Sequence, residues 1–224
     1  YEEIPIAITG GGTTVTKDYA CVEGTHTYTF KAVDAAGNET VTDALTVKLD
    51  TIKPVMGDAA FNEGYKNLWN WLIRKDSLEI TVPIEETGSG IESVEYKLIP
   101  EDGSTAGQPS VKKASVENRA GYKAVIYINP DFKGKIMITA RDHAGNVSDT
   151  KTIGTDGSSI HGIIVEDNAP EITFLVNGSE SLAEEYEKAP TVVVAVKDDE
   201  NNVISAGLAS VAYQVGNSTE HVLH

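Results

Sequence analysis

The sequence has a single cysteine, Cys21, in 224 residues, so no disulfide bond can form within the chain. It has no apolar run of about 18 residues, the length at which a membrane-spanning helix is suspected, and we expect no membrane insertion. Basic residues are few: 18 Lys and Arg stand against 34 Asp and Glu, a formal net charge of −16. This balance disfavours nucleic acids and anionic membrane surfaces as partners because they carry the same sign of charge.

Motifs of the common enzyme classes are also missing. There is no Gly-x-Ser-x-Gly, no His-Glu-x-x-His and no glycine-rich phosphate loop. Adjacent carboxylates such as Glu85 and Glu86 would point to opposite faces of a strand, which is unsuitable for paired acid/base catalysis. Cys21 lies between Ala20 and Val22 with no histidine nearby, so we interpret it as a small buried apolar residue. We therefore predict a protein that is not an enzyme and needs no cofactor.

What the sequence does contain is one seven-residue pattern that occurs twice. Residues 32–38 read Ala-Val-Asp-Ala-Ala-Gly-Asn, and residues 140–146 read Ala-Arg-Asp-His-Ala-Gly-Asn. Each copy follows an alternating run, which predicts a β-hairpin whose Asp accepts turn amides and whose Gly has positive φ. Metal binding by the two aspartates is the less favoured alternative, because no regular series of oxygen ligands surrounds them. The expected turn residues are Asp34, Gly37, Asn38, Asp142, Gly145 and Asn146.

Two further landmarks recur in the same order. The segment 89–98, Ser-Gly-Ile-Glu-Ser-Val-Glu-Tyr-Lys-Leu, returns as Ala-Gly-Leu-Ala-Ser-Val-Ala-Tyr-Gln-Val at 206–215. A proline-bearing linker at 50–54 returns at 167–170. Spacings of 108 to 117 residues predict tandem domains of that size. We expect half a domain at 1–52, a complete domain at 53–168 and the first half of another at 169–224, as in a piece of a longer protein.

The remaining sequence consists of short alternating runs bounded by Gly, Asp or Asn, which predict an all-β protein. Pro83 falls inside one of these runs and predicts an edge position or a bulge, because proline cannot donate to a sheet. In the complete domain the expected strands are 77–84, 92–100, 110–116, 122–128, 134–142, 146–153 and 160–165.

Two groups of side chains are candidates for binding. Tyr65, Trp69 and Trp71 could stack on sugar rings, and the favoured alternative is that one tryptophan closes the end of a sandwich. A short helical turn is an open alternative for this segment. Asp198, Asp199 and Glu200 could bind calcium weakly, although an exposed, solvated turn is the favoured interpretation.

These motifs together resemble the bacterial immunoglobulin-like (Big-type) domains found in tandem on Gram-positive surface proteins, and the resemblance covers almost the whole chain. It implies tandem two-sheet, seven-stranded antiparallel sandwiches with Greek-key connections. Where such domains usually carry Asp before Ser-Gly-Ile, this chain has Glu85 or Glu86, so the resemblance assigns no cation to that position.

The resemblance also implies a function and a location. We expect a non-catalytic extracellular module, on the cell surface or secreted, that acts as a stalk, a spacer or an adhesin segment. The alternative is an accessory module of a secreted glycosidase that binds carbohydrate or a host protein. Because the two terminal pieces are complementary halves of one repeat, we also expect head-to-tail self-association.

Overall fold

All regular elements in the described part of the chain are β-strands, which confirms the all-β prediction. The computed structural model describes residues 14, 16, 18–101, 112–118, 121–154, 159–181, 183, 185–198 and 204–223. It divides into two compact units, one of residues 1–52 with 87–89 and one of residues 53–86 with 90–224. The further boundary expected after residue 168 stays a prediction. None of the described residues belongs to a helix long and apolar enough to cross a bilayer.

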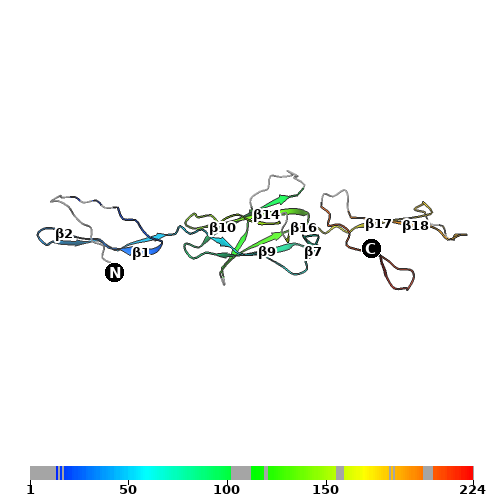
Figure 1. Ribbon diagram of the computed structural model, residues 1–224, viewed down its shortest axis with the longest axis horizontal. Helices are drawn as coiled ribbons and strands as arrows, with labels where there is room; N and C mark the ends of the chain where they lie inside the picture. The colour runs from blue at the N-terminus through cyan, green and yellow to red at the C-terminus, as the bar shows by residue number, and fades with distance from the viewer. Residues whose placement is uncertain are drawn as a thin grey trace. The chain divides into compact units, whose positions relative to one another are not determined.

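The first unit contains two antiparallel strand pairs (Figure 1). The pair β2–β3 flanks the motif turn at residues 34–38. The pair β1–β4 continues the same hairpin toward the linker that follows residue 49. Their residues alternate between polar and apolar, as the period-two pattern predicts. The strands are β1 (Gly24–Tyr28) with β4 (Leu45–Leu49), and β2 (Lys31–Val33) with β3 (Glu39–Val41).

The second unit is built around two sheets. The larger has the order β11-β10-β14-β16-β8-β7, with β15 also paired to β14. Its longest strands, β10 and β14, are antiparallel neighbours over most of their length (Figure 1). These strands are β7 (Lys66–Leu68), β8 (Trp71–Arg74), β10 (Ile91–Pro100), β11 (Lys112–Lys113), β14 (Phe132–Asp142), β15 (Lys151–Ile153) and β16 (Gly162–Val165).

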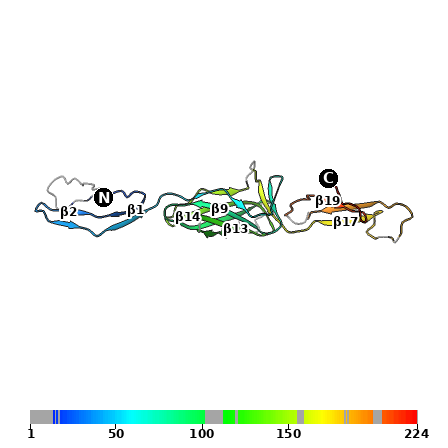
Figure 2. The ribbon, with the colours of Figure 1, turned by 90° about the horizontal axis from the view of Figure 1, so that it is seen from below.

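The smaller sheet has the order β12-β13-β9-β5, with β6 also paired to β9. Figure 2 shows β9 and β13 of this sheet beside β14 of the larger sheet. The strands are β5 (Val55–Met56), β6 (Ala60–Phe61), β9 (Leu78–Glu85), β12 (Ser115–Glu117) and β13 (Tyr122–Ile128).

The core is made by alternate residues of the long strands. In β9 the four apolar positions 78, 80, 82 and 84 are buried, as their alternation in the sequence predicts. Removing this apolar area from water is the main stabilising term of the fold. The fully buried side chains include Leu72, Leu78, Ile80, Val82, Val94, Ile126, Ile128, Ile136, Ile138, Ile163 and Val165.

Some local expectations were wrong. Strand β16 runs parallel to β8, whereas the resemblance implied antiparallel pairing throughout. The segment around Trp69 is a hairpin of β7 and β8 and contains no helical turn. Within 146–153, only a bridge at Val147 and the short β15 are regular. Cys21, expected to be buried, is exposed.

Pro83 is neither at an edge nor in a bulge of its own strand, because β9 lies inside its sheet between β13 and β5. The interruption lies in the neighbouring segment of the same chain, between β5 and β6. The Pro83 carbonyl accepts the Gly57 amide at 2.8 Å, at the break between β5 and β6. The missing N–H of Pro83 therefore faces a gap in the ladder.

The last part of the chain forms two further antiparallel pairs. The first joins the strand that follows the second linker to the valine-rich run at 192–196, and the second contains the repeated Val-Ala-Tyr segment. These strands are β17 (Glu171–Val176) with β18 (Val192–Lys197), and β19 (Val211–Tyr213) with β20 (His221–Leu223).

Candidate functional site

The repeated hairpin turn is organised by its aspartate. Asp142 Oδ1 accepts the Asn146 amide at 2.8 Å, and Oδ2 accepts Asn146 Nδ2 at 2.8 Å. The Gly145 amide donates to the Asp142 carbonyl at 3.2 Å, and Gly145 has a φ of 96°, the positive value that the motif predicts. The Asp142 side chain is completely buried. A carboxylate can be buried in this way because hydrogen bonds replace its lost solvation.

The upstream copy of the turn has the same hydrogen bonds on an exposed surface. Asp34 accepts the amides of Ala36 and Asn38 at 2.9 and 2.8 Å, and it accepts Asn38 Nδ2 at 2.7 Å. Gly37 has a φ of 92°. The Asn38 side chain, followed by the turn amides, lowers the pKa of Asp34. In both copies the carboxylate accepts hydrogen bonds from its own turn.

A second carboxylate holds the repeated glycine turn. Glu86 Oε1 accepts the Gly90 amide at 3.4 Å, and near the end of the chain Asp198 Oδ2 accepts the Gly207 amide at 2.6 Å. Both glycines have positive φ, 83° and 78°. Of the two glutamates before Ser-Gly-Ile, Glu86 is therefore the one that bonds to the glycine turn. Of the predicted calcium ligands, Asp198 has this structural partner, and Asp199 and Glu200 lie outside the described residues.

Calcium removal provides a direct test of the metal prediction. We expect addition of a chelator to leave the melting temperature nearly unchanged. A site filled at 100 times its dissociation constant would contribute about 2.7 kcal/mol, which a melting curve resolves easily. A fall of more than a few degrees, restored by added calcium and not by magnesium, would contradict the prediction.

The linker at 50–54 is bonded to the first unit through Thr51 and to the second unit through Lys53. Thr51 donates from its backbone amide at 3.1 Å and from its hydroxyl at 2.7 Å to Glu23 Oε2. Two residues later, Lys53 Nζ lies 2.6 Å from Asp149 Oδ1. Only Ile52 separates the two anchored residues. The two anchored residues thus lie two positions apart in the chain.

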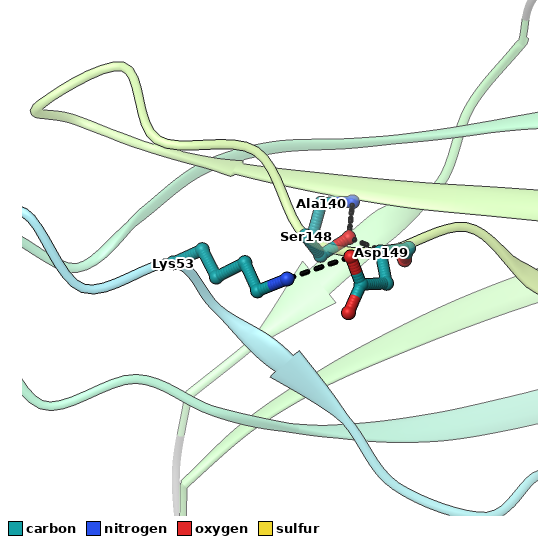
Figure 3. A network of polar contacts seen from close by, with 4 residues as sticks. All are labelled: Lys53, Ala140, Ser148 and Asp149. Atoms are coloured by element: carbon teal, nitrogen blue, oxygen red, sulfur yellow. Dashed lines mark hydrogen bonds and ion pairs between the residues drawn. The ribbon is translucent and has the colours of Figure 1, made fainter.

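The anchor on the second unit belongs to a small polar network (Figure 3). Ser148 is buried; its Oγ accepts the Ala140 amide at 2.9 Å and donates to the Asp149 carbonyl at 3.0 Å. These bonds fix the backbone at Asp149, whose side chain then reaches outward to Lys53. Because the Lys53–Asp149 ion pair is exposed, it contributes little to the free energy of unfolding, and its main effect is to orient the Lys53 side chain.

The same carboxylate turn occurs in both linkers. Asp50 Oδ1 accepts the Ile52 amide at 3.1 Å, and Glu166 Oε2 accepts the Asn168 amide at 2.9 Å. Ser89 donates its amide to Asp50 Oδ2 at 2.7 Å, and hydrogen bonds with Ser89 are the main cause of the lowered pKa of Asp50. The structure thus aligns Asp50 with Glu166, in agreement with the 116-residue spacing of Pro54 and Pro170 in the two linkers.

Glu166 differs from Asp50 because its pKa is raised. Burial is the main cause, followed by the nearby carboxylates of Asp198, Asp167 and Asp131, with the Asn168 amide opposing them. An acid whose pKa is raised on folding stabilises the fold below its unfolded pKa and loses that contribution as the pH rises through the folded value. At neutral pH the charged Glu166 side chain therefore lowers the stability of the fold.

We expect Glu166→Gln to raise the melting temperature at pH 7, since Gln keeps an acceptor for the Asn168 amide and carries no charge. The difference from the parent should close as the pH falls through the raised pKa of Glu166, where the parent also loses its charge. Melting curves at pH 7 and below that pKa measure the effect. The matched control is Glu95→Gln, at an exposed position of β10. A variant that is destabilised at pH 7 would show that the charge is needed.

The three aromatic residues do not form one platform. Trp71 packs edge-on against His161, with ring centroids 4.9 Å apart, and Lys133 Nζ lies 5.2 Å from its ring centre. Tyr65 packs edge-on against Phe61 at 5.8 Å. Trp69 is 66% exposed at the tip of the β7–β8 hairpin. Of the three, Trp69 is the most exposed, and Tyr65 is also exposed at 43%.

The hairpin tip is conformationally unusual. Trp69 and Asn70 have φ values of 53° and 65°, so both central residues of a two-residue turn are left-handed. Such turns favour Asn and Gly, and a left-handed L-residue with a bulky side chain costs roughly 1–2 kcal/mol. No Gly occurs in this turn, which is why the sequence did not predict it.

Comparison with protein-family models and with curated proteins gives no match to this chain. The functional argument therefore rests on the geometry of the chain itself and on the resemblance of its motifs.

Proposed function

We propose that the chain is a non-catalytic, extracellular immunoglobulin-like repeat module that acts as a stalk or spacer, or as an adhesin segment, of a bacterial surface protein. The anchored linker is the observation that supports this most directly. Thr51 is bonded to Glu23 and Lys53 to Asp149, and Ile52, which lies between them, donates its amide to Asp50. A spacer needs such a joint, because a freely rotating one would not hold domains apart.

The use of carboxylates is consistent with this role. Asp34, Asp142, Glu86, Asp198 and Glu166 each accept backbone amides of nearby turns. Acceptors used in this way fix backbone conformation, and the same arrangement recurs from one repeat to the next. Repetition of a stiffening device is what a tandem structural module requires.

Stiffness of the joint can be measured with spin labels. In a Cys21→Ser background, labels at Thr40→Cys and Glu95→Cys, both exposed, report on the two units. We expect a narrow distribution of label distances that broadens in the Glu23→Ala/Lys53→Ala double variant. The control is Lys123→Ala, which removes an exposed ion pair away from the linker. An already broad distribution in the parent would contradict the spacer function.

The second candidate is a ligand-binding accessory module, and the exposed, left-handed Trp69 favours it. Strained residues persist where the surroundings or a function require them, and an exposed indole offers a flat surface to a sugar ring. A glycan array with the full chain separates the candidates. The spacer predicts no saturable binding. Binding that is lost in Trp69→Ala and retained in Tyr127→Ala, another exposed aromatic, would replace the spacer by the accessory module.

We expect Trp69→Asn to raise the free energy of unfolding of the second unit by about 1 kcal/mol, because Asn adopts the left-handed region more readily. Urea denaturation measures the change. The comparison variant Trp69→Ala removes the same ring without relieving the backbone. Equal destabilisation by both substitutions would show that the indole contributes packing that outweighs the strain.

A further inference from the structure

The two sheets of the second unit have outer faces of opposite charge. The strand register identifies each face, because residues paired across neighbouring strands lie on the same side of a sheet. On β10 and β14, Tyr96 and Ile138 are paired and buried. The next pair, Lys97 with Met137, is exposed and therefore lies on the outer face. The same rule applies to each pair of strands in the larger sheet, from β11 to β7.

Basic side chains gather on the outer face of the larger sheet. Among the described residues that the register places there, Glu95 is the acid and the other charged residues are Lys or Arg. Two further acids adjoin them, Glu92 at the bulge of β10 and Glu101 just after its end. This face therefore has an excess of positive charge in a chain whose formal net charge is −16. The basic face consists of Lys66, Lys97, Lys113, Lys133, Lys135 and Arg141.

The outer face of the smaller sheet is acidic. Tyr127 is exposed and pairs with Glu79, which places Glu79 on the outer side of β9. The register also places Glu85 and Glu117 on this side. Lys123 lies there as well, and its Nζ is 3.0 Å from Glu117 Oε2. Of the two outer faces, the excess of positive charge is therefore confined to that of the larger sheet.

The ammonium groups of the basic face are spread over several strands. Lys97 and Lys113 are exposed and make no ion pair with any residue in the described part of the chain. Lys133 Nζ lies 5.2 Å from the ring centre of Trp71 and 3.4 Å from Glu101 Oε2, and both contacts hold it over the sheet. From β11 to β7 the face extends about 24 Å, at about 4.8 Å per strand.

The backbone beneath the basic face is not available to a ligand. Strands β10, β14, β16 and β8 each have a neighbouring strand on both sides. An extended peptide that binds by strand addition needs an open sheet edge, and the centre of this face offers none. Contact with a ligand is therefore made by side chains. The lysines act as point charges that can pair with an acidic group from many directions.

The spacing of the charges favours a polymer of low charge density. Neighbouring outward residues of one strand, such as Lys133 and Lys135, are about 6.8 Å apart along the chain. Double-stranded DNA carries one charge per about 1.7 Å of its axis, and a long duplex would also meet the acidic remainder of this chain. A polysaccharide with one acidic group on each sugar has charges that are farther apart and can lie along the face.

We propose that the basic face binds an acidic polysaccharide, a sugar polymer with regularly spaced acidic groups. This inference goes beyond the spacer function and supplies a ligand class for an adhesin segment, and its test is independent of the stiffness of the linker. The acidic net charge does not prevent binding, because at about 0.15 M salt the Debye length is about 8 Å and distant charges are screened. Binding depends on the charge of the sugar, so it persists in Trp69→Ala.

An oligogalacturonate, in which each sugar carries a carboxylate, tests the proposal together with its methyl ester, which has the same backbone without the charge. We expect the acid to bind at about 0.15 M salt in isothermal titration calorimetry and the ester not to bind. Lys97→Gln/Lys113→Gln should weaken binding about fivefold, because two exposed ion pairs are lost. The control Lys31→Gln/Lys123→Gln has the same net charge, lies outside the basic face and should keep the affinity of the parent.

Glu95→Gln provides a gain that misfolding cannot imitate. Glu95 lies opposite Lys113 on the basic face, and removal of its charge should tighten binding about twofold. Glu85→Gln removes the same charge from the smaller sheet and should have no effect. The proposal is overturned if the parent does not bind the acid or if both lysine double variants lose affinity equally. Equal binding of a polyglutamate of matched charge would also overturn it and assign the face to an acidic protein.

Discussion

Replacing Asp142 by Ala is expected to lower the free energy of unfolding of the second unit by about 3 kcal/mol. The side chain is fully buried and holds the amide and the side-chain nitrogen of Asn146. Hydrogen bonds to a charged group contribute about 1.5–3 kcal/mol each, and loss of the acceptor leaves buried donors unsatisfied. Urea denaturation followed by tryptophan fluorescence measures the change, because both tryptophans belong to this unit.

The first copy of the motif provides the matched control. Asp34→Ala removes the same hydrogen bonds from a turn that is exposed to solvent, where water replaces the lost acceptor. It should leave the transition of the second unit unchanged and affect the first unit only slightly. A loss in Asp142→Ala no larger than that in the Asp34 variant would show that burial adds nothing to the turn.

Gly134→Ala is expected to have the largest effect of any single methyl group, about 3–5 kcal/mol. An added Cβ would overlap the carbonyl oxygen of Ile99 and lie 2.9 Å from the Cα of Pro100. Both obstacles are backbone atoms of the neighbouring strand β10, so relief requires separation of the β10–β14 pair. Overpacking of this kind costs several kcal/mol because the sheet cannot move locally. The urea midpoint and the yield of folded protein both report the effect.

Gly145→Ala adds the same methyl group where space is available. Its nearest neighbour would be Arg141 Nη1 at 3.9 Å, so only the left-handed φ of 96° opposes the substitution. We expect a loss of about 1 kcal/mol. If the two alanine variants were equally destabilised, close approach of β10 would not be the reason for glycine at position 134.

The sequence was informative wherever a local rule decides the structure. Alternation in β9 and β13 predicted their buried faces, because successive residues of a strand point to opposite sides. The Asp-x-Ala-Gly-Asn motif predicted its turn, because the hydrogen bonds are made within the motif. A motif that makes its own hydrogen bonds does not show whether it is buried. Asp34 and Asp142 have equivalent sequences and bonds, yet of the two Asp142 alone is buried.

Features that depend on distant residues were not predictable. The parallel pairing of β16 with β8 joins residues about 90 positions apart, and no local pattern encodes its direction. The choice of Glu86 over Glu85 depends on where the Gly90 amide lies. Trp71 and Trp69 are two residues apart, yet one packs against His161 and the other is exposed. The aromatic prediction therefore named the right segment and could not separate its members.

The two ends of the segment 53–168 are held very differently, and this has a consequence for a protein under tension. Strand β16 leads directly into the second linker and is bonded on both sides, to β14 and, in parallel, to β8. Strand β5 follows the first linker and is bonded over two residue pairs only, to β9. A force transmitted through the linkers would have to shear β16 out of two ladders at once, whereas it could peel β5 away one bond at a time. The domain would therefore lengthen first by releasing β5, a short and reversible extension that absorbs a pull before the core is lost.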